Sequence, residues 1–136
     1  MISEHGSLSL FLQQMAARLG TPTLITGRAA SRIPHFSTYY HTRVIGYLHM
    51  TSSNKLEAIY EILNGDSQER QRMKMDTKSE FEDGIRLFMA KSYAYARRRF
   101  IHVLQQDPKD GVAKEYILLC ERLIHSEKEE TWLDQF

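Results

Sequence analysis

The side chains best suited to chemistry in this chain are its histidines, but their spacing builds no reactive centre. No two of them lie four residues apart on one predicted helix, the spacing that brings two imidazoles to one metal ion. His41 and His49 share one face of a predicted strand, yet at about 3.3 Å per residue they lie too far apart to bind one ion. We therefore expect ordinary surface or core histidines and no bound metal. The six are His5, His35, His41, His49, His102 and His125.

Arginine and lysine runs could bind phosphate, but their geometry favours a solvated surface. Arg97, Arg98 and Arg99 are consecutive, and three successive helical residues fan across about 200°, so they form no single row. We expect them to be solvated or to make ion pairs between helices. Four further cations lie in one polar stretch and are expected to be solvated side chains of a linker: Arg70, Arg72, Lys74 and Lys78.

The single cysteine and the aromatic residues are expected to be structural. Cys120 lies on the Tyr116 side of the last predicted helix, where a buried small apolar side chain fits better than a reactive thiol. Tyr95 falls off the apolar face of its helix and is expected to be exposed. Four other aromatic residues are expected to pack between helices: Phe81, Phe88, Tyr93 and Phe100. No Ser/His/Asp or Cys/His set and no Gly-rich phosphate loop is present in the sequence.

Composition narrows the class of protein further. The chain has 136 residues, 42% of them hydrophobic, and a formal net charge of +1, so its overall charge attracts neither nucleic acid nor an anionic membrane. One cysteine excludes an intrachain disulfide and suits a reducing compartment. No stretch has the roughly 18 continuous apolar residues needed to span a bilayer, and no signal peptide is recognisable. We expect one domain or two very small ones, in the cytoplasm.

The first half of the chain reads as a mixture of helices and strands. Apolar residues at helical spacing predict a helix over 7–19, and a β-branched run predicts a strand over 23–26. A brief helix is expected over 27–36, ended by a proline. Strands are predicted over 39–50 and 56–63, joined by turn residues into an antiparallel hairpin.

The second half reads as helical. Helices are predicted over 78–90 and 93–106, and Asp110 can cap a third helix that runs to about residue 124. The first two have the spacing of one tetratricopeptide-like unit, a pair of antiparallel helices that needs a neighbour to bury both faces. The residues at the repeat positions are Gly84, Leu87, Tyr93, Ala96, Phe100, Val103 and Leu104, followed by Asp107-Pro108.

The predicted fold class is therefore α+β. A helix, a short strand and an antiparallel β-hairpin come first, and an all-α helical hairpin with a third helix follows. The predicted division is a domain over 1–65, a linker over 66–79, a helical unit over 80–125 and a charged tail over 126–136.

Three pieces of residues 2–65 form a recognisable series: Gly20–Thr26, Arg43–Met50 and Ile59–Leu63. In their order and spacing they resemble the C-terminal portion of a class III nucleotidyl cyclase catalytic domain. The second half looks like the helical tail that often follows bacterial cyclase domains. It matches that pattern at Phe81, Gly84, Phe88, Ala96, Phe100, Asp107, Pro108, Asp110, Ala113, Tyr116 and Cys120.

The resemblance also implies that the chemistry of cyclisation is lost. The family's two metal-binding aspartates and its purine contact would lie upstream of Met1, so the first two-thirds of a cyclase domain is expected to be absent. The family's transition-state Asn and Arg align with Ser7 and Phe11, and its phosphate-binding lysine aligns with Thr51. Phenylalanine carries no charge and cannot stabilise a phosphoryl group. No catalytic, cofactor-binding or metal residue is therefore assigned.

The leading hypothesis is a cyclase-derived, non-catalytic interaction or dimerisation module linked to cyclic-nucleotide signalling. Its partners are expected to be another protein or a second copy, with no nucleic acid, no membrane segment, no cofactor and no bound nucleotide. One alternative is the C-terminal fragment of an adenylate or guanylate cyclase, a phosphorus–oxygen lyase active only with the missing segment. Another is a stand-alone helical-repeat adaptor.

Overall fold

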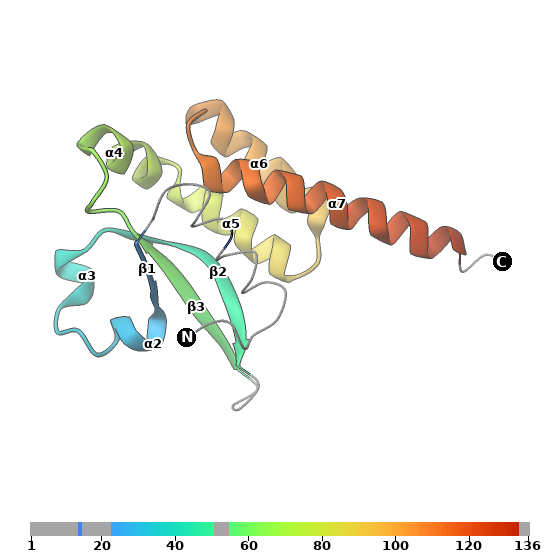
Figure 1. Cartoon of the computed structure of the whole chain (residues 1–136). Helices are drawn as coiled ribbons and strands as arrows, with labels where there is room; N and C mark the ends of the chain where they lie inside the picture. The colour runs from blue at the N-terminus through green and yellow to red at the C-terminus, as the bar shows by residue number, and fades with distance from the viewer. Residues whose placement is uncertain (1–13, 15–22, 51–54, 134–136) are drawn as a thin grey trace. The chain divides into compact units, whose positions relative to one another are not determined.

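The computed structural model describes residue 14 and residues 23–50 and 55–133 of the chain. The chain divides into two compact units, with the boundary between Asp76 and Thr77. The described residues contain one three-stranded antiparallel sheet and six helices, labelled α2 to α7 in Figure 1. The fold is therefore of the α+β class, as predicted. The helix expected over 7–19 lies outside the described residues.

The sheet of the first unit is built around β3. Its strands are β1 (Thr23–Thr26), β2 (Thr42–Met50) and β3 (Lys55–Ile62), in the order β1-β3-β2. Both pairings are antiparallel, so the predicted hairpin of β2 and β3 is confirmed. The registers bring Leu24 of β1 and Arg43 of β2 opposite Glu61 on either side.

An irregularity in the pairing of β2 changes which of its residues face inward. Val44 pairs with Tyr60, whereas Gly46 pairs with the next residue of β3, Ile59, so one extra residue, Ile45, is inserted. Because a strand alternates its side chains with period two, the insertion shifts the buried set by one position. The buried apolar residues of the two strands and the residue after them are Ile45, Leu48, Ile59 and Leu63.

Residues 27–41 form two short helices where the sequence predicts one brief helix and the start of a strand. The first, α2 (Gly27–Ala30), is capped by the Thr26 hydroxyl, which accepts a hydrogen bond from the Ala29 N–H at 3.0 Å. The second, α3 (Phe36–Tyr39), follows a left-handed residue at His35, with φ of 56°. The predicted brief helix is therefore present from residue 27 but ends at Ala30, before Pro34, and the prediction of strand from residue 39 was wrong, because a second helical turn follows His35.

The segment predicted as a linker contains α4 (Gln68–Asp76). Its start is fixed by Ser67, whose hydroxyl accepts a hydrogen bond from the Arg70 N–H at 3.2 Å, as expected of an N-terminal cap. None of its residues is fully buried. Polar contacts, described below, therefore hold this helix to the sheet.

The second unit consists of α5 (Lys78–Met89), α6 (Tyr93–Gln106) and α7 (Gly111–Leu133), with each helix packed on the next. The predicted limits of the first two helices are confirmed to within one residue. Asp110 caps α7 as predicted, since its Oδ1 accepts a hydrogen bond from the Ala113 N–H at 3.2 Å. The backbone of α7 continues to Leu133, beyond the predicted end near residue 124.

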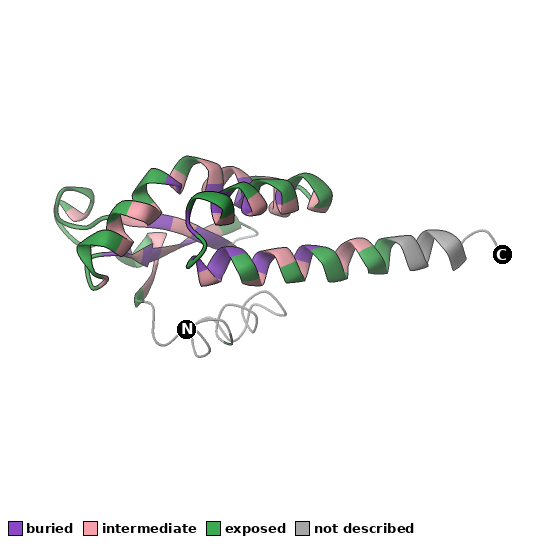
Figure 2. Ribbon diagram, turned by 90° about the horizontal axis from the view of Figure 1, so that it is seen from above, coloured by how far each residue is buried: buried purple, intermediate pink, exposed green. Residues whose placement is uncertain are grey.

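The core of the helical unit is aromatic. Phe100 of α6 stacks on Tyr116 of α7 with ring centroids 5.0 Å apart, and it meets Phe81 of α5 edge-on at 5.4 Å. Phe88 of α5 meets Tyr116 at 5.2 Å. These contacts confirm the prediction that the phenylalanines pack between helices. Figure 2 shows buried and exposed residues alternating along α7, as expected of a helix with one face in a core.

No helix among the described residues is both long enough and apolar enough to cross a membrane.

Candidate functional site

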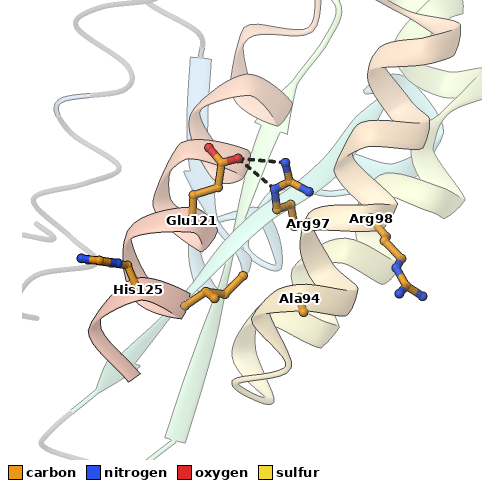
Figure 3. A pocket seen from close by; sticks show the side chains of 6 residues that line it. Ala94, Arg97, Arg98, Glu121 and His125 are labelled. Carbon is orange, nitrogen blue, oxygen red and sulfur yellow. Dashed lines mark hydrogen bonds and ion pairs between the residues drawn. The ribbon is translucent and has the colours of Figure 1, made fainter. Parts of the chain in front are cut away.

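An open depression of about 490 Å³ lies between α6 and α7 of the helical unit. It is lined by Ala94, Arg97, Arg98, Glu121, Ile124 and His125. In Figure 3 the guanidinium of Arg97 reaches across to Glu121, and both its Nε and its Nη2 lie 2.9 Å from Glu121 Oε2. This ion pair joins two helices and neutralises both charges at the floor of the depression.

Arg98 is oriented differently from its neighbour. Figure 3 shows its side chain turned away from the Arg97–Glu121 pair. Its guanidinium lies 5.5 Å from the centre of the Tyr95 ring, within the range of a cation–π interaction. Tyr95 is 60% exposed, as predicted, so this arginine–tyrosine pair lies on the surface of α6. Such a pair can contact an acidic or aromatic group of another protein.

Arg99 takes part in a second ionic contact, between α6 and α5. Its Nη1 lies 3.4 Å from Glu80 Oε2, and His102 Nδ1 lies 2.8 Å from Glu80 Oε1. Thus Arg97 and Arg99 both make ion pairs between helices, which confirms that expectation. Pairs of this exposure contribute about 0–1 kcal/mol each, so they orient the helices more than they stabilise them.

A largely buried ionic network lies in the other unit and is centred on Glu61 of β3. Glu61 Oε1 accepts a hydrogen bond from Arg43 Nε at 2.9 Å, and its Oε2 accepts one from Lys74 Nζ at 2.7 Å. Lys74 Nζ also lies 2.8 Å from Asp66 Oδ2. The side chains of Arg43 and Glu61 are 0% and 3% exposed, so this network is almost dry.

Lys74 is therefore not a solvated side chain of a linker, and that prediction was wrong. Its side chain is only 12% exposed and connects α4 to the central strand of the sheet. A buried carboxylate requires compensation by cations and hydrogen bonds. Each oxygen of Glu61 has its own cationic donor, so the site is satisfied as it stands. This arrangement positions α4 on the central strand.

Cys120 is buried, as predicted, and the reactivity of its thiol is low. Burial raises the pKa of its thiol to about 11, and the carboxylate of Glu121 acts in the same direction while Arg97 opposes it. At neutral pH the side chain is a thiol, which is a poor nucleophile and a poor metal ligand. Burial likewise raises the pKa values of Tyr93 and Tyr116. These groups remain protonated and packed.

The other residues considered from the sequence do not form a reactive cluster in the described part of the chain. His35, His41, His102 and His125 are all exposed. Among the residues that the structure describes, no three His, Cys, Asp or Glu side chains come close enough to hold a metal ion. Ser7, Phe11 and Thr51, which align with the cyclase positions, lie outside the described residues.

The Glu61 network was missed by sequence reasoning. Arg43 and Glu61 are 18 positions apart on two different predicted strands, and Lys74, 13 positions from Glu61, lies in a segment predicted as a linker. One signal existed: Arg43 and Glu61 each lie among apolar residues of a predicted strand, where an unpaired buried charge would be costly. Recognising the pair required the register of the hairpin.

Comparison of the chain with protein-family models, with curated proteins and with solved structures finds no match.

Proposed function

We propose that this chain is a cyclase-derived, non-catalytic module that acts through protein contacts in cyclic-nucleotide signalling. The observation that carries the proposal is the surface of the helical unit. The depression between α6 and α7 and the exposed Tyr95–Arg98 pair lie on helices fixed by an aromatic core. A rigid surface that presents tyrosine and arginine is typical of protein-binding sites.

The close approach of α5 and α6 supports the tetratricopeptide-like part of the proposal. A Cβ atom at Gly84 would lie 2.8 Å from Cζ of Phe100, closer than real Cβ atoms approach. The small residue on one helix and the large ring on the other therefore interlock. This explains why the repeat-like spacing places glycine at 84 and phenylalanine at 100, and a repeat of this kind serves to present a binding surface.

The order of elements supports the cyclase part of the proposal. The resemblance implies a strand, a short helix and two further strands, in that order. The described residues follow it with β1, the short helices α2 and α3, and the hairpin of β2 and β3. The same order favours the alternative function, a cyclase fragment that becomes active with a missing segment. The two functions differ in whether the chain contributes to turnover.

Turnover and association assays test the proposal. The purified chain is incubated with ATP or GTP and Mn²⁺, and the products are separated to detect cyclic nucleotide. We expect none, and clear turnover would refute the non-catalytic assignment. Light scattering over a range of concentrations then tests self-association. We expect association that weakens in Arg98→Glu and persists in Lys114→Glu, an exposed charge reversal on α7 outside the depression.

A further inference from the structure

A second candidate surface lies in the first unit, on the two short helices α2 and α3. We define the tyrosine–arginine surface as Arg28, Arg32, Ile33, Tyr39 and Tyr40. Tyr39 is 68% exposed, and Ile33 and Tyr40 are each 39% exposed. Both arginines are also exposed. Large apolar and aromatic side chains exposed together within eight residues mark an interaction site more often than scattered ones do.

The tyrosine–arginine surface is held rigidly. Asn64 fixes the end of α3, because its Oδ1 accepts a hydrogen bond from the His41 N–H at 2.7 Å and its Nδ2 donates one to the Tyr39 carbonyl at 3.1 Å. The rings of Phe36 and Tyr40 stack with centroids 5.0 Å apart. These contacts fix the backbone at Tyr39 and the ring of Tyr40, so that ring loses little conformational entropy when a partner binds.

The sequence around the surface has an asymmetry of charge that the net charge of +1 conceals. Glu4 is the only acidic residue before Glu57, so 16 of the 17 acidic residues of the chain lie from Glu57 onward. Residues 5–56 therefore contain no carboxylate side chain. The nearest acidic group with a defined contact is that of Glu57, and its Oε1 accepts a hydrogen bond from the Arg28 backbone N–H at 2.6 Å. That contact places the carboxylate at the start of α2.

We propose that the tyrosine–arginine surface binds an acidic segment of a partner protein that also carries apolar or aromatic side chains. Carboxylates of the partner would pair with Arg28 and Arg32, and its apolar side chains would cover Tyr39, Tyr40 and Ile33. Arginine and tyrosine are the residues most enriched at the energetic centres of protein interfaces. This inference concerns a different unit from the depression between α6 and α7, and it does not depend on that site.

Two other occupants fit less well. Phosphate contacts supply most of the affinity in non-specific nucleic-acid binding, whereas the tyrosine–arginine surface has only two arginines among apolar side chains. A symmetric contact with a second copy requires a self-complementary surface, but the tyrosine–arginine surface contains two cations and no carboxylate to pair with them. An acidic protein segment satisfies both the charge and the apolar area.

The test is selection of short peptides from a random displayed library on the full chain. Enriched peptides are synthesised, and their affinities are measured by fluorescence anisotropy for the wild type, Arg32→Glu, Tyr39→Ser and Leu118→Ser. We expect acidic peptides with aliphatic or aromatic residues, a loss of about thirtyfold in Tyr39→Ser, and weaker binding as salt is raised. The control Leu118→Ser removes a large apolar side chain that is 53% exposed on α7, outside the depression between α6 and α7, and should change nothing.

Several results would overturn the proposal. Enrichment of neutral or basic peptides would contradict the charge argument, and so would no enrichment at all. Equal affinity for the wild type and Tyr39→Ser would place binding elsewhere. Single-stranded DNA that binds more tightly than any peptide and depends on Tyr39 would make this a nucleic-acid surface. A wild-type dimer that becomes monomeric in Tyr39→Ser would make it a contact between copies.

Discussion

Neutralising Glu61 should destabilise the first unit more than any exposed substitution on its surface. Glu61→Gln keeps the shape of the side chain, so the effect reports charge and hydrogen bonding and not a cavity. The substitution removes the carboxylate that accepts from Arg43 at 2.9 Å and from Lys74 at 2.7 Å. It also directs an amide N–H₂ group toward one of the two cations.

The expected magnitude follows from the burial of the network. Hydrogen bonds to charged groups contribute about 1.5–3 kcal/mol each, and breaking a buried ion pair by removing one partner costs about 3–5 kcal/mol. Arg43 is completely buried and cannot turn to solvent, but the amide oxygen still accepts one hydrogen bond and Lys74 keeps its contact with Asp66. We therefore expect a loss near the lower end of that range, about 3 kcal/mol. Domains have total stabilities of about 5–15 kcal/mol. The loss is therefore a large fraction of the stability of the unit.

Urea denaturation measures the loss, with amide hydrogen exchange in β3 used to assign it to the first unit. The matched control is Glu69→Gln, which removes the same charge from an exposed position of α4 and should cost less than about 1 kcal/mol. In the Glu61→Gln background, Lys74→Met should cost less than it does in the wild type, because the ion pair is already broken. A loss below about 1 kcal/mol for Glu61→Gln, or full additivity with Lys74→Met, would refute the reasoning.

Three further predictions concern the helical unit. Gly84→Ala should lower the thermal stability of the helical unit, because the new Cβ would meet the ring of Phe100. Overpacking costs about 1–3 kcal/mol, from which a gain of about 1 kcal/mol in helix propensity is subtracted. An unchanged melting curve in circular dichroism would contradict this. Asp110→Ala should cost about 1 kcal/mol by removing the cap on the Ala113 N–H, measured by urea denaturation, whereas Asp110→Asn should keep most of it. The Cys120 thiol should resist disulfide exchange reagents in the native protein at pH 8 and react fully in urea, and rapid labelling of the native protein would disprove its burial. Because folding raises the pKa of this thiol from 9.0 to about 11, the stability it contributes is complete below pH 9 and is lost as the pH rises toward 11.

The helices of the second unit could be placed from the sequence because their limits are set by neighbouring residues. Apolar residues at helical spacing mark α5 and α6, and Asp107-Pro108 ends the run. The cap at Asp110 acts on the backbone three residues away. Signals that act over only a few residues can be read from the sequence without knowing the rest of the fold. Hairpin strands with a turn between them were predictable for the same reason.

The short helices after β1 show where local signals were insufficient. Asn64, which follows β3, binds the Tyr39 carbonyl and the His41 N–H, so the strand expected from residue 39 begins at Thr42. A residue 23 and 25 positions away therefore decides where β2 begins. No local propensity of residues 27–41 contains that information.

The sequence alone determined the class of the fold, the helical hairpin, the exposure of Tyr95 and the burial of Cys120, since these depend on spacing along the chain. Only the tertiary structure decided that Glu61 joins Arg43 to Lys74, that an extra residue shifts the buried face of β2, and that exposed tyrosines and arginines gather on α2 and α3. The physical reason is range. Periodicity and capping act within a few residues, whereas the pairing of buried charges depends on strand register and on a helix that returns to the sheet.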